Sequence, residues 1–454
     1  MQRYLYILIF LANAGSALQA QNADRERFLN ATVYRLTLEE KWDSVLYFCD
    51  RAEVENIVSY ELSYSKGKAL FATQKYRLAL TEFIATAEMA EPGSDLKSYL
   101  YYSAKYSGMS NTARFWRFSM NGDERIKFGI GYFPVVEYVA AEYSNFISDN
   151  TEKNGAVQFF PPEPITFKSS YFKMTGNMQN TSASAGFGLC KRLGIYFSVN
   201  DLSTKDQYRL AYVDIPGAPL VYTNFAATTD QQSAYIATPI LTGRKTTVVP
   251  AFHMISVRTT SFNQGPNAGE AIIADTSFAE HVASLTVSFE ADRSARSFSA
   301  SWSDLSQQDQ IQFSFFNTWY PDYNLNQHYT LSLTGQSDGG FPGFAAGFSG
   351  GWKLTDFCWT EAGVRVGKLS DFNDFNGRIV HNNGDIRIAS LEINPVFLIT
   401  QHLSLSLLYS WSLNKLPYTL SDGSSGAGWR RISSSKINTQ YNQHNLTGGL
   451  IWKL

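Results

Sequence analysis

The feature that most constrains this chain is an alternation of apolar and polar residues that recurs from about residue 121 to the C-terminus. In residues 281–290, Ala283, Leu285, Val287 and Phe289 are separated by Ser, Thr and Ser. A period of two places alternate side chains on opposite faces of a β-strand. The pattern therefore predicts strands with one apolar and one polar face.

The same alternation returns in further segments, among them 297–303, 311–315, 329–334, 344–354, 403–413 and 446–454. We expect strands of about ten residues, with Tyr, Trp or Phe often near the ends of the apolar face. A soluble β-sandwich also alternates, but its second face usually carries more charge than the Ser, Thr, Gly and Gln mixture found here. Charged residues make up only 17% of the chain, against about 25% in an average protein. The pattern favours a transmembrane β-barrel with an apolar exterior and a polar lumen.

Polar connections rich in Gly, Asn and Asp separate these strands. Long ones are expected near residues 140–163, 215–232, 261–277, 370–383 and 414–438, and short ones near 242–245, 292–294, 354–356 and 399–400. Their rough alternation is typical of long extracellular loops and tight periplasmic turns. We count about sixteen strands, and fourteen is equally defensible because residues 176–214 are ambiguous. The prediction is an antiparallel barrel of about 14–16 strands over residues 121–454, an even number that puts both of its ends in the periplasm.

Residues 24–118 have helical periodicity and repeat themselves at about 34 residues. Trp42 aligns with Tyr76, and Cys49 aligns with Phe83. The better copy has Gly and Ala where two antiparallel helices would cross, and a closing proline at Pro92. This spacing resembles tetratricopeptide (TPR) repeats, which bind peptides or partner proteins on a concave face. We predict TPR-like helical hairpins over residues 21–120, with a generic helical hairpin domain as the alternative.

The first twenty residues have the pattern of a signal peptide. Arg3 is followed by an apolar run over 4–11 that is too short to span a bilayer, and small residues lead to a cleavage site near Ala20 or Ala17. A buried N-terminal helix is the alternative. We predict a signal peptide over residues 1–20 and an exported mature protein.

The last strand, residues 443–454, resembles the C-terminal β-signal of outer-membrane proteins, although it ends in Leu454 with Trp452 two positions earlier rather than in Phe or Trp. Together with the preceding features, the chain resembles a bacterial outer-membrane β-barrel protein with a short periplasmic TPR-like domain. The resemblance is to a class and identifies no particular family. It implies an α+β membrane protein in the outer membrane, with the N-terminal domain in the periplasm and the long loops outside.

Catalytic and metal-binding patterns are weak. Residues 347–351 match the G-x-S-x-G nucleophile elbow, but that motif needs a strand-to-helix turn, and Ser349 falls on an alternating strand. The six histidines are scattered singly. Residues 371–377 offer oxygen ligands in a predicted extracellular loop. Their acidic residues do not fall at the positions that a calcium-binding EF-hand loop requires, so we interpret them as an Asn/Asp/Gly turn. The prediction is a non-enzyme without catalytic, cofactor-binding or metal residues; a barrel-wall phospholipase stays the enzymatic alternative.

Charged residues on the predicted strands are candidates for the lumen, where they would set selectivity in a channel or form paired filling in a closed barrel. These candidates are Lys168, Lys173, Arg209, Arg258, Glu290, Glu361 and Arg365.

The charge balance, 38 basic against 40 acidic residues, argues against a nucleic-acid partner. We expect outer-membrane lipid around the barrel and a periplasmic or outer-membrane protein bound to the helical domain. The favoured function is a subunit of an outer-membrane assembly, secretion or export machine. The alternative is a porin-like or exopolysaccharide-export channel, whose known exporters share the domain order but typically carry far longer TPR arrays.

Overall fold

The computed structural model describes residues 23–130, 135–157, 169–212, 221–264, 271–337, 342–421, 430–432 and 439–453. The predicted signal peptide, Lys168 and Leu454 lie outside these residues. The chain forms two compact units. One comprises residues up to 133 with the short segments 291–293 and 320–325, and the other comprises the remaining residues.

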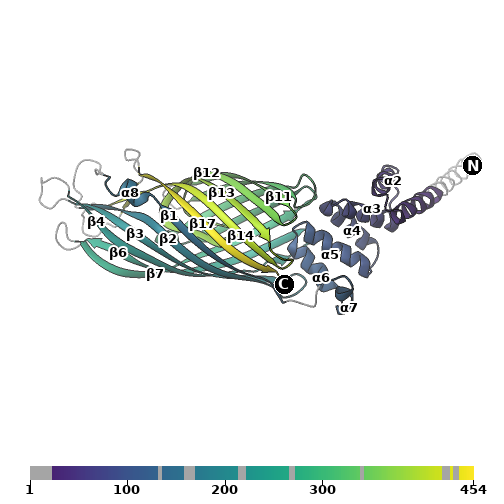
Figure 1. The fold of residues 1–454 in the computed structure, drawn as a ribbon, viewed down its shortest axis with the longest axis horizontal. Coiled ribbons are helices and arrows are strands. Elements are labelled where there is room, and N and C mark those ends of the chain that lie inside the picture. Colours follow the sequence, from purple (N-terminus) through teal and green to yellow (C-terminus); the bar gives the residue numbers. More distant parts are fainter. Residues whose placement is uncertain are drawn as a thin grey trace, which may run out of the picture. The chain divides into compact units, whose positions relative to one another are not determined.

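The first unit is helical (Figure 1). A helix over residues 23–38 is followed by α2 (Trp42–Val54), α3 (Tyr60–Ala72), α4 (Tyr76–Met89), α5 (Ser94–Tyr106), α6 (Ser110–Ser119) and α7 (Gly122–Lys127). None of the helices in the described residues is both long and apolar enough to cross a membrane.

The helices recur with a regular spacing. α2, α4 and α6 begin at intervals of 34 residues, as do α3 and α5. Val45 and Ala79, one interval apart, are both fully buried. A Cβ atom on Gly67 would lie 2.5 Å from the Phe83 ring, so α3 and α4 approach each other at a position that only glycine accommodates without a shift. The packing has the period found in the sequence, and assignment to the TPR class stays a prediction.

The helical region runs past residue 120, where the sequence pattern places the start of the barrel. Asn121 accepts a hydrogen bond from the Glu124 amide at 2.9 Å, and the Glu124 carboxylate accepts one from the Asn121 amide at 2.7 Å. This reciprocal capping begins one more helix, α7. The first strand starts only at Val136.

The second unit is a closed barrel of fourteen antiparallel strands (Figure 1). They are β1 (Val136–Ser148), β2 (Ser169–Gly188), β3 (Gly194–Tyr212), β4 (Val221–Ala237), β6 (Thr246–Gln264), β7 (Ala271–Glu290), β8 (Ser294–Ser303), β9 (Gln310–Trp319), β10 (Gln327–Ser337), β11 (Gly343–Thr355), β12 (Cys358–Asp374), β13 (Ile379–Leu398), β14 (Leu403–Lys415) and β17 (Gln440–Lys453). β1 pairs with both β2 and β17, which closes the barrel. The predicted fold class is confirmed, with fourteen of the 14–16 predicted strands.

Short elements complete the barrel unit. They are the helix α8 (Asn150–Asn154), the 3-10 turn η1 (Leu305–Gln307) and the strands β5 (Ile240–Leu241), β15 (Tyr418–Ser421) and β16 (Arg430–Ile432). β15 and β16 form a hairpin whose first strand also pairs with β2.

The two faces of the barrel wall differ as the alternation predicts. Along β7, Leu285 is 49% exposed, whereas the next residue, Thr286, is 3% exposed. Most large apolar side chains exposed on the strands share the outward parity, including Phe298 on β8 and Phe313 on β9. In a bilayer every backbone polar group must be paired, which a closed barrel achieves. An apolar exterior on such a barrel is the surface of an outer-membrane protein.

Several strands are much longer than the predicted ten residues, up to 20 in β2, β7 and β13. On β3 the outward side chains change from Phe197 and Val199 to Asp201 and Lys205, all of them exposed. Val199 lies beside Ala234 of β4, which lies beside Met254 of β6, so the apolar surface ends at one level across three strands.

The long loops predicted at 215–232 and 261–277 are therefore wrong in large part. β4 begins at Val221, β6 extends to Gln264, and β7 begins at Ala271. Beyond the apolar belt the outward side chains of these strands are mostly polar or small, while some luminal ones, such as Ile255 and Val257, are apolar, so the pattern of a membrane strand is lost there. Strand pairing, rather than side-chain pattern, extends the wall there.

Val287 provides a test of the outward face, since it points away from the lumen between Val248 and Phe298 of the neighbouring strands. Val287→Arg should lower the free energy of unfolding by about 2–4 kcal/mol if the site lies near the membrane midplane. The measurement is a denaturant titration of the protein in lipid vesicles. Ser288→Arg, on the luminal face, is the matched control and should cost less. Equal costs for the two variants would contradict the assignment of faces.

Candidate functional site

The end of the β12–β13 hairpin folds into the barrel and lies across its lumen. At its tip, Ser284 Oγ of β7 donates a hydrogen bond to the Asn376 carbonyl at 2.6 Å, and Thr286 Oγ1 donates one to Asn376 Oδ1 at 2.7 Å. His253 Nδ1 of β6 lies 2.7 Å from the Gly377 carbonyl oxygen. Four strands separate β7 from β12 in the wall. We call residues 371–385 the inner hairpin.

This location corrects the prediction of an extracellular loop at 371–377. The bend is made where the register of β12 on β13 shifts, between Val366 and Leu369 and again between Ser370 and Phe372. Asp371 (φ 49°) and Gly384 (φ 82°) have left-handed backbone conformations, one on each side of the hairpin. The Gly384 amide donates to Asp371 Oδ1 at 2.7 Å and so joins the two bends.

The side of the inner hairpin pairs with the wall through amide groups. Gln312 Nε2 of β9 donates to the Asn373 carbonyl at 2.7 Å, and the Asn373 amide donates to Gln312 Oε1 at 3.2 Å. Asn373 Nδ2 donates to Ser301 Oγ of β8 at 2.9 Å. The side chain of Gln312 thus replaces a neighbouring strand as the partner of the hairpin backbone.

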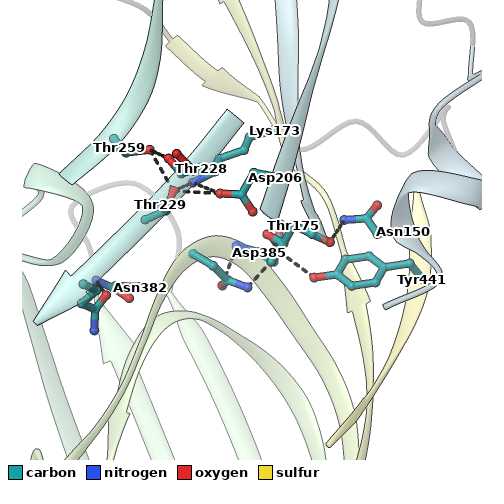
Figure 2. Close-up of polar contacts among 12 residues, drawn as sticks. Asn150, Lys173, Thr175, Asp206, Thr228, Thr229, Thr259, Asn382, Asp385 and Tyr441 are labelled. Atoms are coloured by element: carbon teal, nitrogen blue, oxygen red, sulfur yellow. Dashed lines mark hydrogen bonds and ion pairs between the residues drawn. The ribbon is translucent and has the colours of Figure 1, made fainter. Parts of the chain in front are cut away.

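A second set of polar side chains holds the base of the inner hairpin (Figure 2). Asp385 Oδ2 accepts hydrogen bonds from Tyr441 at 2.6 Å and from Thr175 at 3.0 Å. Asn382 Nδ2 donates to Glu280 Oε2 of β7 at 2.6 Å. The base is therefore bound to β2, β17 and β7.

Beside Asp385 lies an ion pair of the wall itself. Lys173 Nζ is 2.8 Å from Asp206 Oδ2, and Thr229 Oγ1 donates to the same oxygen at 2.8 Å (Figure 2). The short helix α8 also packs here, because its fully buried Asn150 donates to the Thr175 carbonyl at 3.2 Å. Arg209 binds the residues after α8 and donates to the Val157 carbonyl at 2.7 Å. All these groups are polar or charged, as expected in a polar lumen.

One luminal charge is exposed near the end of the barrel where β12 begins. Glu361, on the same face of β12 as the luminal Arg365, has a 62% exposed side chain and lies 3.7 Å from His328 Nε2 of β10. Small luminal side chains such as Ser332 and Ser349 line this part. The inner hairpin lies farther along the lumen from these residues, toward the end of the barrel where β12 ends.

Of the predicted luminal charges, Lys173, Arg209, Glu361 and Arg365 point inward. Glu290 continues the face of the luminal Ser288 at the end of β7. Arg258 is exposed on the outer face of β6. Sequence reasoning missed other charged residues of the lumen, among them Asp206, Glu280, Asp374, Asp385 and Arg387. The available signal for Asp374 and Asp385 was the high Asp and Asn content of the stretches around them, which is unusual for a strand.

The catalytic pattern at 347–351 lies in the middle of β11, so the strand-to-helix turn of a nucleophile elbow does not exist at Ser349. No group of three His, Cys, Asp or Glu side chains in the described residues has the geometry to hold a metal ion.

No protein-family model and no curated protein matches this sequence. Among solved structures, the translocator domain of autotransporter NalP from Neisseria meningitidis matches at 9% identity, covering 77% of this chain and 99% of that one, with a TM-score of 0.30. A Pseudomonas aeruginosa FadL homologue matches at 11% identity over 70% and 90% of the two chains, with a TM-score of 0.42. CdiB from Acinetobacter baumannii matches at 10% identity over 70% and 60%, with a TM-score of 0.33.

These similarities are too low to carry a functional argument, and the fold assignment rests on the strand pairing of this chain. By that pairing and its apolar exterior, the chain is an outer-membrane β-barrel of fourteen strands that follows an N-terminal helical region.

Proposed function

We propose that this protein is a non-enzymatic outer-membrane barrel of a transport or export system, whose passage the inner hairpin closes at rest. The helical region binds a protein partner in the periplasm. The observation that carries the proposal is the inner hairpin, which reaches from β12 and β13 to β6 and β7 across the lumen.

The contacts of the inner hairpin suit a removable closure. At the tip, the hydrogen bonds to β6 and β7 join neutral groups and are each worth about 0.5–1.5 kcal/mol net, and the Arg378 guanidinium donates one more to the Tyr196 hydroxyl of β3. Phe375, 63% exposed, has a left-handed backbone (φ 50°), which is rare for an aromatic residue and costs about 1–3 kcal/mol. A permanent core would be expected to bury such a side chain. An open porin-like pore is disfavoured by the same hairpin, because it occupies the space through which solutes would pass.

The helical region supports the docking role through its first two helices. Tyr34 and Leu38, one turn apart, are 64% and 68% exposed, and Tyr47 and Val54 of α2 are 61% and 83% exposed. Residues four or seven positions apart lie on one face of a helix. Exposed apolar faces of this kind are typical of protein interaction sites.

Removal of the closure should open the passage. Replacing residues 373–382 by an Asn-Gly turn deletes the tip contacts but keeps β12 and β13 paired along the wall. The shortened protein should conduct ions in planar bilayers far better than the full-length protein. Thr286→Cys/Asn376→Cys, whose native side chains touch at 2.7 Å, should form a disulfide that keeps conductance low until a reductant is added. The single variant Thr286→Cys is the control without a disulfide. Equal conductance of the shortened and full-length proteins would contradict the closure.

Loss of the docking faces should release the partner without affecting the barrel. Deleting residues 24–118, or changing Tyr34, Leu38 and Tyr47 to Ser, should leave an inserted, heat-modifiable barrel that no longer co-purifies with its partners, because the barrel pairs its own backbone. Ile126→Ser, at a residue 63% exposed on α7, is the control. If the deletion variant still co-purifies with all the partners of the full-length protein, the docking role is refuted. If the deletion instead raises conductance without loss of partners, the helices cover the mouth of the barrel.

The orientation can be tested with the native cysteines. Cys190 is exposed in the turn between β2 and β3, at the end of the barrel where β1 begins, whereas Cys49 is buried and burial raises its pKa to about 12. If this end faces the periplasm, a membrane-impermeant maleimide should label Cys190 only after the outer membrane is permeabilised. Cys190→Ser removes the signal, and Asp309→Cys in that background, at the opposite end, should be labelled in intact cells. The reverse pattern would invert the orientation.

A further inference from the structure

Two arginines of the barrel wall converge beside the inner hairpin. Arg365 of β12 and Arg387 of β13 place their guanidinium carbons 6.0 Å and 5.3 Å from the centroid of the Phe372 ring. Both also line one small cavity of about 10 Å³, together with Ser390. Two positive charges thus share one place in the lumen, where like charges repel each other unless an anion lies between them.

Two carboxylates act electrostatically on these arginines: Glu392 of β13, which belongs to the wall, and Asp374 of the inner hairpin. Asp374 Oδ2 accepts a hydrogen bond from Arg365 Nη1 at 2.8 Å, and His381 Nε2 lies 3.6 Å from the same oxygen. Arg387 does not reach this carboxylate: its Nη1 lies 3.5 Å from His381 Nε2. Within the described part of the chain, Arg387 Nε has no hydrogen-bond partner. Asp374 is thus hydrogen-bonded to only one of the two guanidinium groups, and Arg387, which lies within the field of Asp374 and Glu392, keeps an N–H donor that no described group accepts.

We infer that Arg365 and Arg387 form a binding site for an oxyanion of the transported solute, and that Asp374 is an internal substitute for it. The solute would carry a carboxylate, phosphate or sulfate group. This inference rests on the proposed closure by the inner hairpin and names the chemistry that opens it.

The chemistry of the two side chains favours an oxyanion over a halide. A guanidinium group presents its N–H donors in a planar fork that matches the oxygens of carboxylates and phosphates. A free oxyanion can bind both guanidinium groups at once, because the covalent path that restricts Asp374 is absent. Asp374 in turn has the advantage of being attached to the site, which acts as a high local concentration. The closed form therefore prevails until the solute accumulates.

Binding at this site is coupled to the position of the inner hairpin. Asp374 is the last residue of β12, immediately before the tip that contacts β6 and β7. A ligand shifts an equilibrium only when it binds one state better than the other. The oxyanion meets this condition, because the cavity between the arginines, about 10 Å³, is too small for it, and the space and the Arg365 Nη1 donor become available only when Asp374 has left. Displacement of Asp374 then detaches the hairpin at the point where it enters the lumen.

The test measures the full-length protein in planar bilayers while inorganic phosphate replaces chloride at constant ionic strength. Phosphate should raise the conductance of the unmodified protein. Asp374→Asn should conduct without phosphate, with the open-to-closed ratio increased about 10- to 100-fold, as expected for the loss of one charge-assisted hydrogen bond. Arg387→Gln should stay closed, because the Arg365–Asp374 contact remains, and should lose the response to phosphate. Arg258→Gln, on the outer face, should behave like the unmodified protein.

A second readout avoids dependence on how well each variant inserts. Phosphate should slow disulfide formation in Thr286→Cys/Asn376→Cys, and chloride should not. The inference is overturned if phosphate changes neither conductance nor cross-linking, if Asp374→Asn is as closed as the unmodified protein, or if Arg387→Gln responds normally. If the shortened hairpin conducts in these cases, the closure stands and only the oxyanion site fails. If the shortened hairpin does not conduct either, the proposed function fails as well.

Discussion

The pairing of β1 with β17 is the interaction on which the rest of the structure depends. Without it, two strands would present unpaired amides and carbonyls to lipid, at a cost of several kcal/mol for each group. Closure makes the wall a cylinder with one face toward lipid and one toward the lumen. The alternation of apolar and polar residues follows from that geometry, because successive side chains on each strand meet two different solvents.

A polar lumen must be filled with water or with polar protein groups, and this barrel uses both. Near the start of β12 the luminal Glu361 side chain is 62% exposed. Farther along the lumen, the inner hairpin brings its own backbone into the lumen, where Gln312 and Ser284 pair with it. A loop in an apolar interior would leave such groups unsatisfied. The same polarity that allows the hairpin to enter also makes its contacts replaceable by water.

The sequence predicts the barrel well because alternation is a local signal with one physical cause. It predicts the inner hairpin poorly because a turn rich in Asn, Asp and Gly looks the same in outside water and in a polar lumen. The register shifts near Leu369 and Phe372 change the parity of the following residues, so Asp374 and Arg387 could not be assigned to the lumen by counting. Counting does assign Lys173, Arg209 and Arg365 to the lumen, because they lie on stretches of strand without such a shift.

The charges that bind the hairpin to the wall indicate a role beyond stability. Ion pairs removed from water contribute little net stability, and apolar residues of the same volume in their place are often as stable or more stable. A closure meant only to fill the lumen would have no need for them. In the Arg365–Asp374 pair, one partner belongs to the wall and the other to the segment that blocks it. The neighbouring Arg387 is left without a direct carboxylate contact among the described residues. An arrangement in which the hairpin carboxylate is hydrogen-bonded to only one of two neighbouring guanidinium groups favours exchange with a mobile ligand over permanent packing.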